Sequence, residues 1–202
     1  MPKSKIKMLE RIGISIAQDD DAKKLIYALR TATGGELYGT LLDFVRRGWM
    51  SHEEFYQLVP PSSYNVATEV RDILLAVIYE YQNRRDKGEE FPIMEEEAEP
   101  IAPDETLRQI QRIGGRLIEG LPNLGRWIGR LRTSRNPMMI RGAYLSAVQR
   151  GAIGWSDFIF LAPLEDVNRL FLLRDYLLAY LFDRARDQIP QEEIEEENEE
   201  EV

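Results

Sequence analysis

A pattern repeated 103 residues apart is the feature of this sequence that most constrains its fold. The segment GTLLDFVRRG at residues 39–48 is matched by GAYLSAVQRG at residues 142–151, and the same offset continues through Arg71-Asp72 and Arg174-Asp175. Upstream the offset shortens slightly, because Arg11 corresponds to Arg112. About a third of the positions from 39 to 79 are identical to their counterparts. We interpret the pattern as a tandem duplication, which predicts one fold used twice.

Apolar residues in both halves follow the spacing of helices rather than strands. Val70, Leu74 and Val77 fall on one helical face, and no run of β-branched residues alternates with polar ones between turn signals. The sequence therefore predicts an all-α fold of two tandem, pseudo-symmetric helical repeats with about five helices each. Residues 140, 144, 145 and 148 form a second apolar stripe that should face the core of the second repeat.

Several residues predict where these helices begin and end. Gly48 and Gly151 stand where a glycine commonly ends a helix. Ser51 and Glu54 have the spacing of a capping box at the start of a short helix. His52, in the first turn of that helix, is expected to be exposed.

Charge divides the chain into four parts. The net charge of −9 comes from two short segments, because residues 1–88 sum to +1 and residues 104–187 sum to +4. Residues 89–103 contain six glutamates and three prolines, and residues 188–202 contain eight glutamates. We expect a helical repeat at 1–88, an acidic linker at 89–103, a helical repeat at 104–187 and an acidic tail at 188–202.

The residues that usually carry catalysis are scarce. The chain has no cysteine, and His52 is its only histidine. Its counterpart in the second repeat is Trp155, so the shared scaffold does not need a histidine there. We expect no enzyme activity, no metal, no cofactor and no small-molecule substrate. No apolar run resembles a signal peptide or a membrane span, so we expect a soluble, cytoplasmic protein.

Two charged positions are kept in both repeats. Arg47 and Asp72 correspond to Arg150 and Asp175. We expect Arg47–Asp72 and Arg150–Asp175 to be structural ion pairs that hold the end of one helix against the long helix that follows. An arginine at a helix C-terminus is favourable in its own right.

Arginines concentrate in the second repeat, where no acidic residue lies between Glu119 and Asp157. The first repeat has three aspartates in the corresponding region, at residues 19–21. Because guanidinium groups bind phosphate well, the cluster predicts contact with a nucleic-acid backbone or an acidic partner. The residues concerned are Arg108, Arg112, Arg116, Arg126, Arg130, Arg132, Arg135 and Arg141.

These features favour a non-enzymatic subunit of a larger, nucleoprotein-like assembly that also contacts other protein subunits. Its acidic segments would prevent unspecific binding or touch a basic neighbour. A first alternative is a protein–protein adaptor or inhibitor that docks through the apolar helix at residues 170–182 and mimics nucleic acid with its tail. A second alternative is an enzyme with a carboxylate-lined pocket between the repeats. The arginines could also pair with the chain's own glutamates.

Overall fold

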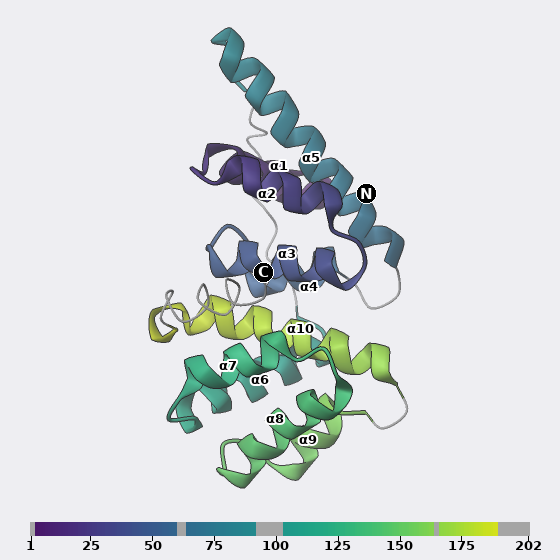
Figure 1. The fold of residues 1–202 in the computed structure, drawn as a ribbon, viewed down its shortest axis with the longest axis vertical. Helices are drawn as coiled ribbons and strands as arrows, with labels where there is room; N and C mark the ends of the chain where they lie inside the picture. Colours follow the sequence, from purple (N-terminus) through teal and green to yellow (C-terminus); the bar gives the residue numbers. More distant parts are fainter. Residues whose placement is uncertain (1–2, 60–63, 92–102, 164–165, 190–202) are drawn as a thin grey trace, which may run out of the picture. The chain divides into compact units, whose positions relative to one another are not determined.

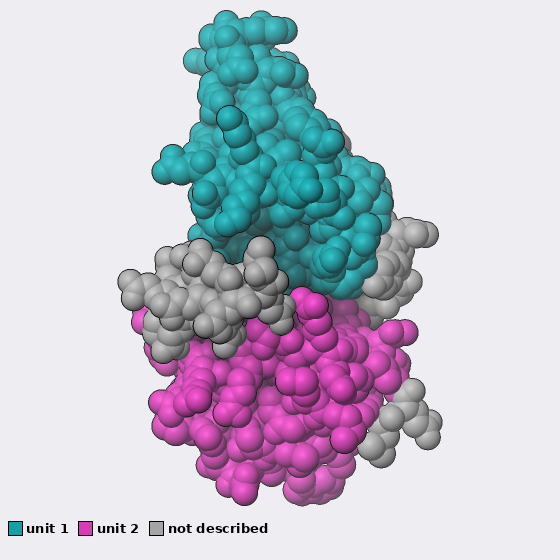
Figure 2. Space-filling model, in the orientation of Figure 1, with its two compact units in different colours: residues 1–102 teal, residues 103–202 magenta. Residues whose placement is uncertain are grey.

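The structure is a computed structural model that describes residues 3–59, 64–91, 103–163 and 166–189. It divides into two compact units, Met1–Ala102 (unit 1) and Pro103–Val202 (unit 2), which Figure 2 distinguishes by colour. The described part contains ten α-helices, one short 3₁₀ helix and no strand, so the predicted all-α class is confirmed. Most of the acidic linker, residues 92–102, and of the acidic tail, residues 190–202, lie outside the described residues.

Unit 1 is built from five helices whose core forms between the first and the last of them. α1 packs along α5 more extensively than any other pair in the unit, and α2 contacts both (Figure 1). Leu9, Ile12, Leu74 and Ile78 are fully buried on these helices. The helices are α1 (Lys3–Gln18), α2 (Ala22–Thr31), α3 (Gly35–Arg46), α4 (His52–Leu58) and α5 (Tyr64–Lys87).

Unit 2 is likewise built from five helices, followed by the 3₁₀ helix η1 (Arg186–Gln188). Its most extensive packing is between α6 and α10, and α10 also contacts α7, α8 and α9. Ile110, Leu117 and Leu177 are fully buried there. The helices are α6 (Glu105–Gly120), α7 (Leu124–Thr133), α8 (Pro137–Gln149), α9 (Trp155–Leu161) and α10 (Val167–Arg184).

The helix ends follow the local sequence. Gly48 and Gly151 have φ angles of 78° and 73°, which side chains rarely tolerate, and their N–H groups donate to the carbonyls of Val45 and Val148. The capping box predicted at α4 is present, since Ser51 Oγ accepts from Glu54 N and Glu54 Oε2 accepts from Ser51 N. No helix in the described part of the chain is both long enough and apolar enough to cross a membrane.

Candidate functional site

Seven of the eight arginines predicted to contact phosphate lie on three consecutive helices of unit 2, and the eighth lies two residues before the third helix. On α6 they recur every four residues, which places them on one face of that helix. Four of the eight have side-chain partners within unit 2, and four have none among the residues that the structure describes. α6 carries Arg108, Arg112 and Arg116, α7 carries Arg126, Arg130 and Arg132, Arg135 lies before α8, and Arg141 lies in α8.

Asp157 binds two of the arginines. Its carboxylate oxygens accept from Arg112 Nη2 and Arg116 Nη1, each at 3.0 Å, and one of them also accepts from Gly154 N at 3.0 Å. The Asp157 side chain is 1% exposed, whereas the two arginine side chains remain about half exposed. The cluster ties α6 to the start of α9, so Arg112 and Arg116 have a structural role.

Two further arginines are held against the body of unit 2. Arg141 Nη2 donates to the carbonyl oxygen of Pro163 at 3.1 Å. The guanidinium of Arg132 lies 5.9 Å from the centre of the Phe182 ring, a cation–π distance. Both side chains are partly buried. They are therefore poorly placed to meet a nucleic-acid backbone.

The remaining four arginines, Arg108, Arg126, Arg130 and Arg135, are exposed, and we call them together the exposed cationic surface. None of their guanidinium groups has a hydrogen-bond or ion-pair partner among the residues that the structure describes. Arg126 and Arg130 lie one turn apart on α7. The only acidic residue from position 120 to 163 is the buried Asp157, so no exposed acid accompanies Arg126, Arg130 and Arg135 in that stretch, whereas Arg108 follows the exposed Asp104 and Glu105.

The predicted ion pairs Arg47–Asp72 and Arg150–Asp175 are not the pairs that form. Arg47 Nη1 lies 3.4 Å from Asp19 Oδ1 and its Nη2 lies 3.6 Å from Asp21 Oδ2. Asp72 instead pairs with Arg71, its neighbour in sequence, at 2.8 Å. In unit 2, Asp175 likewise pairs with its sequence neighbour Arg174, and Arg150 is exposed. In both units the aspartate therefore pairs with the arginine that precedes it in sequence.

A buried polar cluster surrounds Asp175 in unit 2. Asp175 Oδ1 accepts from Arg174 Nε at 2.9 Å, and Arg174 Nη1 donates to the carbonyl oxygen of Ser134 at 2.7 Å. Burial raises the pKa of Asp175 to about 6, against the opposing effect of Arg174. Burial likewise raises the pKa of Tyr144, and its hydroxyl has no hydrogen-bond partner among the described residues. The hydrogen bond from Arg174 ties α10 to Ser134, the residue that directly follows α7.

This cluster predicts a pH-dependent stability. The folded-state pKa of Asp175 lies above its unfolded value, so the folded state holds the proton more tightly. Relative to Asp175→Asn, the wild-type chain should lose up to about 3 kcal/mol of unfolding free energy as pH rises from about 4 to about 7. Urea unfolding at both ends of this range measures the difference. A difference between the two proteins that stays constant with pH would contradict it.

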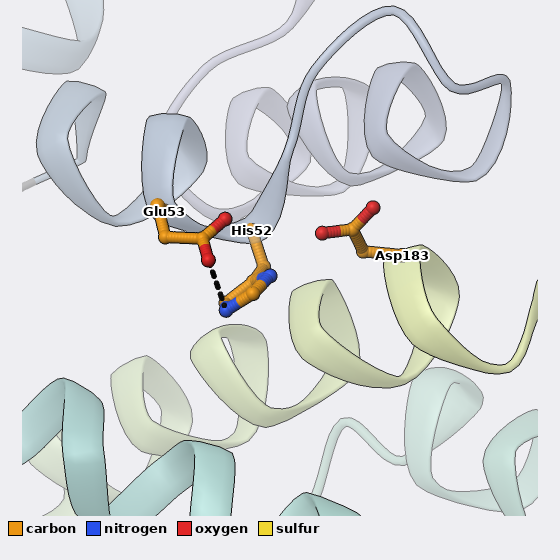
Figure 3. Close-up of side chains that lie close together, drawn as sticks. All are labelled: His52, Glu53 and Asp183. Atoms are coloured by element: carbon orange, nitrogen blue, oxygen red, sulfur yellow. Dashed lines mark ion pairs between the residues drawn. The ribbon is translucent and has the colours of Figure 1, made fainter. Parts of the chain in front are cut away.

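His52 differs from its sequence-based expectation. Its side chain is 1% exposed rather than solvent-facing, and Nε2 lies 3.1 Å from Glu53 Oε1 (Figure 3). Burial of an imidazole costs little when its nitrogen has a polar partner. The prediction of an exposed residue at the helix start was therefore wrong.

An exposed apolar surface on α8 and α9 was not predicted. Its five side chains are between 54% and 74% exposed, and Leu145 among them had been expected in the core. Residues 137–148 are apolar on nearly every side, and a helix of that kind at the edge of a small unit must expose one face. The apolar composition of residues 137–148 was the sequence signal that could have predicted this exposed face. The residues are Met138, Met139, Leu145, Trp155 and Ile159.

The apolar helix at residues 170–182, by contrast, belongs to the core. Leu170, Leu173, Leu177 and Leu178 of α10 are at most 2% exposed.

No protein-family model matches the chain, and no similar protein was found among curated proteins or solved structures. The residues and their geometry alone therefore support the function proposed below.

Proposed function

We propose that this chain is a non-enzymatic binding subunit made of two copies of one helical unit, and that unit 2 contacts a nucleic-acid phosphate backbone. The observation that carries the proposal is the exposed cationic surface. Arg126, Arg130 and Arg135 have no described intramolecular partner and stand in a stretch whose only acid is buried. A phosphate backbone supplies the negative charges that this surface lacks.

The order and length of the helices support the duplication. From α1 to α5 the helices contain 16, 10, 12, 7 and 24 residues. From α6 to α10 they contain 16, 10, 13, 7 and 18 residues. The first and last helices form the most extensive pair in each unit. One ancestral five-helix unit accounts for this agreement.

Side-chain contacts at matching positions give further support. Arg11 of α1 pairs with Glu54 of α4, and Arg112 of α6 pairs with Asp157 of α9. The two acids also occupy the same capping position, because each accepts a hydrogen bond from the backbone N–H three residues before it. Such a shared arrangement of ion pair and cap is characteristic of a common scaffold.

The two units differ where the binding role is proposed. In unit 1, Arg47 is paired with Asp19 and Asp21, which lie between α1 and α2. Unit 2 has Leu121, Pro122 and Asn123 between α6 and α7, with no acid. Arg150, the counterpart of Arg47, is therefore exposed and has no described partner. The two units thus share the arginine but differ in the acids around it, and this difference in charge favours a role of unit 2 in binding.

Reversal of the exposed charges tests this proposal. The variant Arg126→Glu/Arg130→Glu/Arg135→Glu should bind a labelled single-stranded or duplex oligonucleotide at least about 10-fold more weakly near 0.1 M salt. The slope of log affinity against log salt should also fall by about two to three, since each lost phosphate contact removes about one. Fluorescence anisotropy across a salt series measures both quantities.

The matched control lies on the equivalent helix of unit 1. Lys23, Lys24 and Arg30 of α2 are also exposed, and reversing all three changes the net charge by the same amount. This variant should keep most of the affinity. Equal losses in both variants would indicate a general charge effect and contradict a localised surface. If the wild-type chain does not bind either oligonucleotide at low salt, the proposal is wrong.

A second candidate function is that of a protein–protein adaptor. The helix at residues 170–182 is buried, so it does not supply the docking surface in this structure. The observation that favours an adaptor is the exposed apolar surface on α8 and α9, which large aliphatic and aromatic side chains dominate. An assembly subunit needs both a nucleic-acid contact and a protein contact, so the two functions are compatible.

A further inference from the structure

Five exposed apolar side chains stand on the neighbouring helices α8 and α9 of unit 2, and we call them the α8–α9 apolar surface (Met138, Met139, Leu145, Trp155 and Ile159). α8 and α9 pack against each other (Figure 1). Single exposed apolar residues are ordinary on protein surfaces, but five on two adjacent helices mark an interaction site.

The spacing of these residues fits a helical partner. Met138 and Leu145 lie two turns apart on α8, a rise of about 10 Å, and Trp155 and Ile159 lie one turn apart on α9, about 6 Å. Gly142 is exposed on the same face as Met138 and Leu145, and apart from its own helix backbone and chain neighbours no atom lies within 4 Å of where its Cβ would be. The missing side chain leaves room for a partner's backbone. A helix with apolar residues at i, i+4 and i+7 matches these dimensions.

The charges beside this surface indicate the charge that a partner should carry. Arg135 precedes α8 and Arg150 follows it, both exposed and without a described partner. Asp157 is buried on Arg112 and Arg116, and the exposed Glu119 shares a hollow beside residues 151–154 with Arg116, so arginine remains in excess there. A partner helix flanked by Glu or Asp would complement the two arginines, whereas one flanked by Lys would be repelled.

The side-chain composition favours protein over nucleic acid at this surface. Trp, Met and Arg are the residues enriched at protein interfaces, while Asp, Glu and Lys are depleted there. We propose that the α8–α9 apolar surface docks an acidic amphipathic helix of a partner protein, with Trp155 as the central anchor. At 72% exposure, Trp155 offers the largest apolar side chain of the surface. This inference does not depend on the proposed nucleic-acid contact.

A displayed library of helical peptides, each about 18 residues long, is the probe for this docking. Selection on the full chain should enrich peptides with apolar residues at i, i+4 and i+7 and a net negative charge. A selected peptide should bind Trp155→Ala and Leu145→Ser each at least about 30-fold more weakly than wild type in fluorescence anisotropy. Replacing its Glu and Asp residues by Lys should abolish binding.

The control substitution is Tyr27→Ala, because Tyr27 is similarly exposed at 68% but lies on α2 of unit 1. It should leave peptide affinity unchanged.

The inference is overturned if no peptide is enriched, if the selected peptides are basic, or if they bind Trp155→Ala as well as wild type. Self-association that Leu145→Ser abolishes would make a second copy the occupant. Binding to vesicles containing anionic lipid that Trp155→Ala abolishes would make a membrane the occupant. Either result also overturns it.

Discussion

Gly114→Ala is expected to destabilise unit 2 by at least about 2 kcal/mol, even though alanine is the better helix former. Gly114 lies in α6 where this helix packs on α10, and a Cβ there would be 2.1 Å from Cδ1 of Tyr180. Overpacking of this severity costs about 3 kcal/mol or more, and helix propensity offsets about 1 kcal/mol of that. Urea unfolding followed by circular dichroism measures the loss.

The neighbouring residue provides the control. A Cβ at Gly115 would meet only Tyr180 Oη at 3.7 Å, an ordinary contact, so Gly115→Ala should stabilise unit 2 by up to about 1 kcal/mol. Tyr180→Ala in the Gly114→Ala background should recover part of the loss, as a double-mutant cycle would reveal. If both alanine variants have the same unfolding free energy, α6 does not pack on α10 as closely as described here.

Asp175→Ala is expected to cost about 3 kcal/mol of unfolding free energy, because it leaves the buried guanidinium of Arg174 without its charged partner. The side chains of Arg174 and Asp175 are 15% and 5% exposed. The corresponding pair in unit 1 has the same sequence, but the Asp72 side chain is 61% exposed. Asp72→Ala should therefore cost less than about 1 kcal/mol, as exposed ion pairs do.

Thermal and urea unfolding of the two alanine variants tests this contrast. Replacing both members of the buried pair with apolar residues, as in Arg174→Met/Asp175→Leu, should restore much of the stability, because no uncompensated charge remains. Comparable losses for Asp72→Ala and Asp175→Ala would indicate that the pairs have the same environment. That result would contradict the burial assigned to Asp175.

Local sequence predicted the helices and their ends well. Apolar spacing gave the all-α class, and the positive φ angles of Gly48 and Gly151 agree with their predicted role at helix ends. The capping box at Ser51 and Glu54 is also confirmed. These features depend on residues a few positions apart, so the interactions that produce them are contained within the segment itself.

Side-chain partners were predicted poorly. The repeated pattern singled out Arg47, Asp72, Arg150 and Asp175, but it did not predict which charges meet. An ion pair requires atoms within a few ångströms, and the helix packing that brings Arg47 to Asp19 cannot be read from spacing in sequence. Of the eight arginines predicted as a binding face, four contact other residues of unit 2. These contacts also depend on helix packing, so spacing in sequence could not predict them.

The sequence by itself determined the all-α class and several helix ends, because backbone hydrogen bonds, caps and apolar periodicity are local properties. It also located the excess of arginine in the second half. Only the tertiary structure decided that Asp157 is buried on Arg112 and Arg116, that Arg126, Arg130 and Arg135 remain exposed, and that Leu145 faces outward. Burial and charge pairing depend on which helix faces meet, and that choice is made by packing across the whole unit.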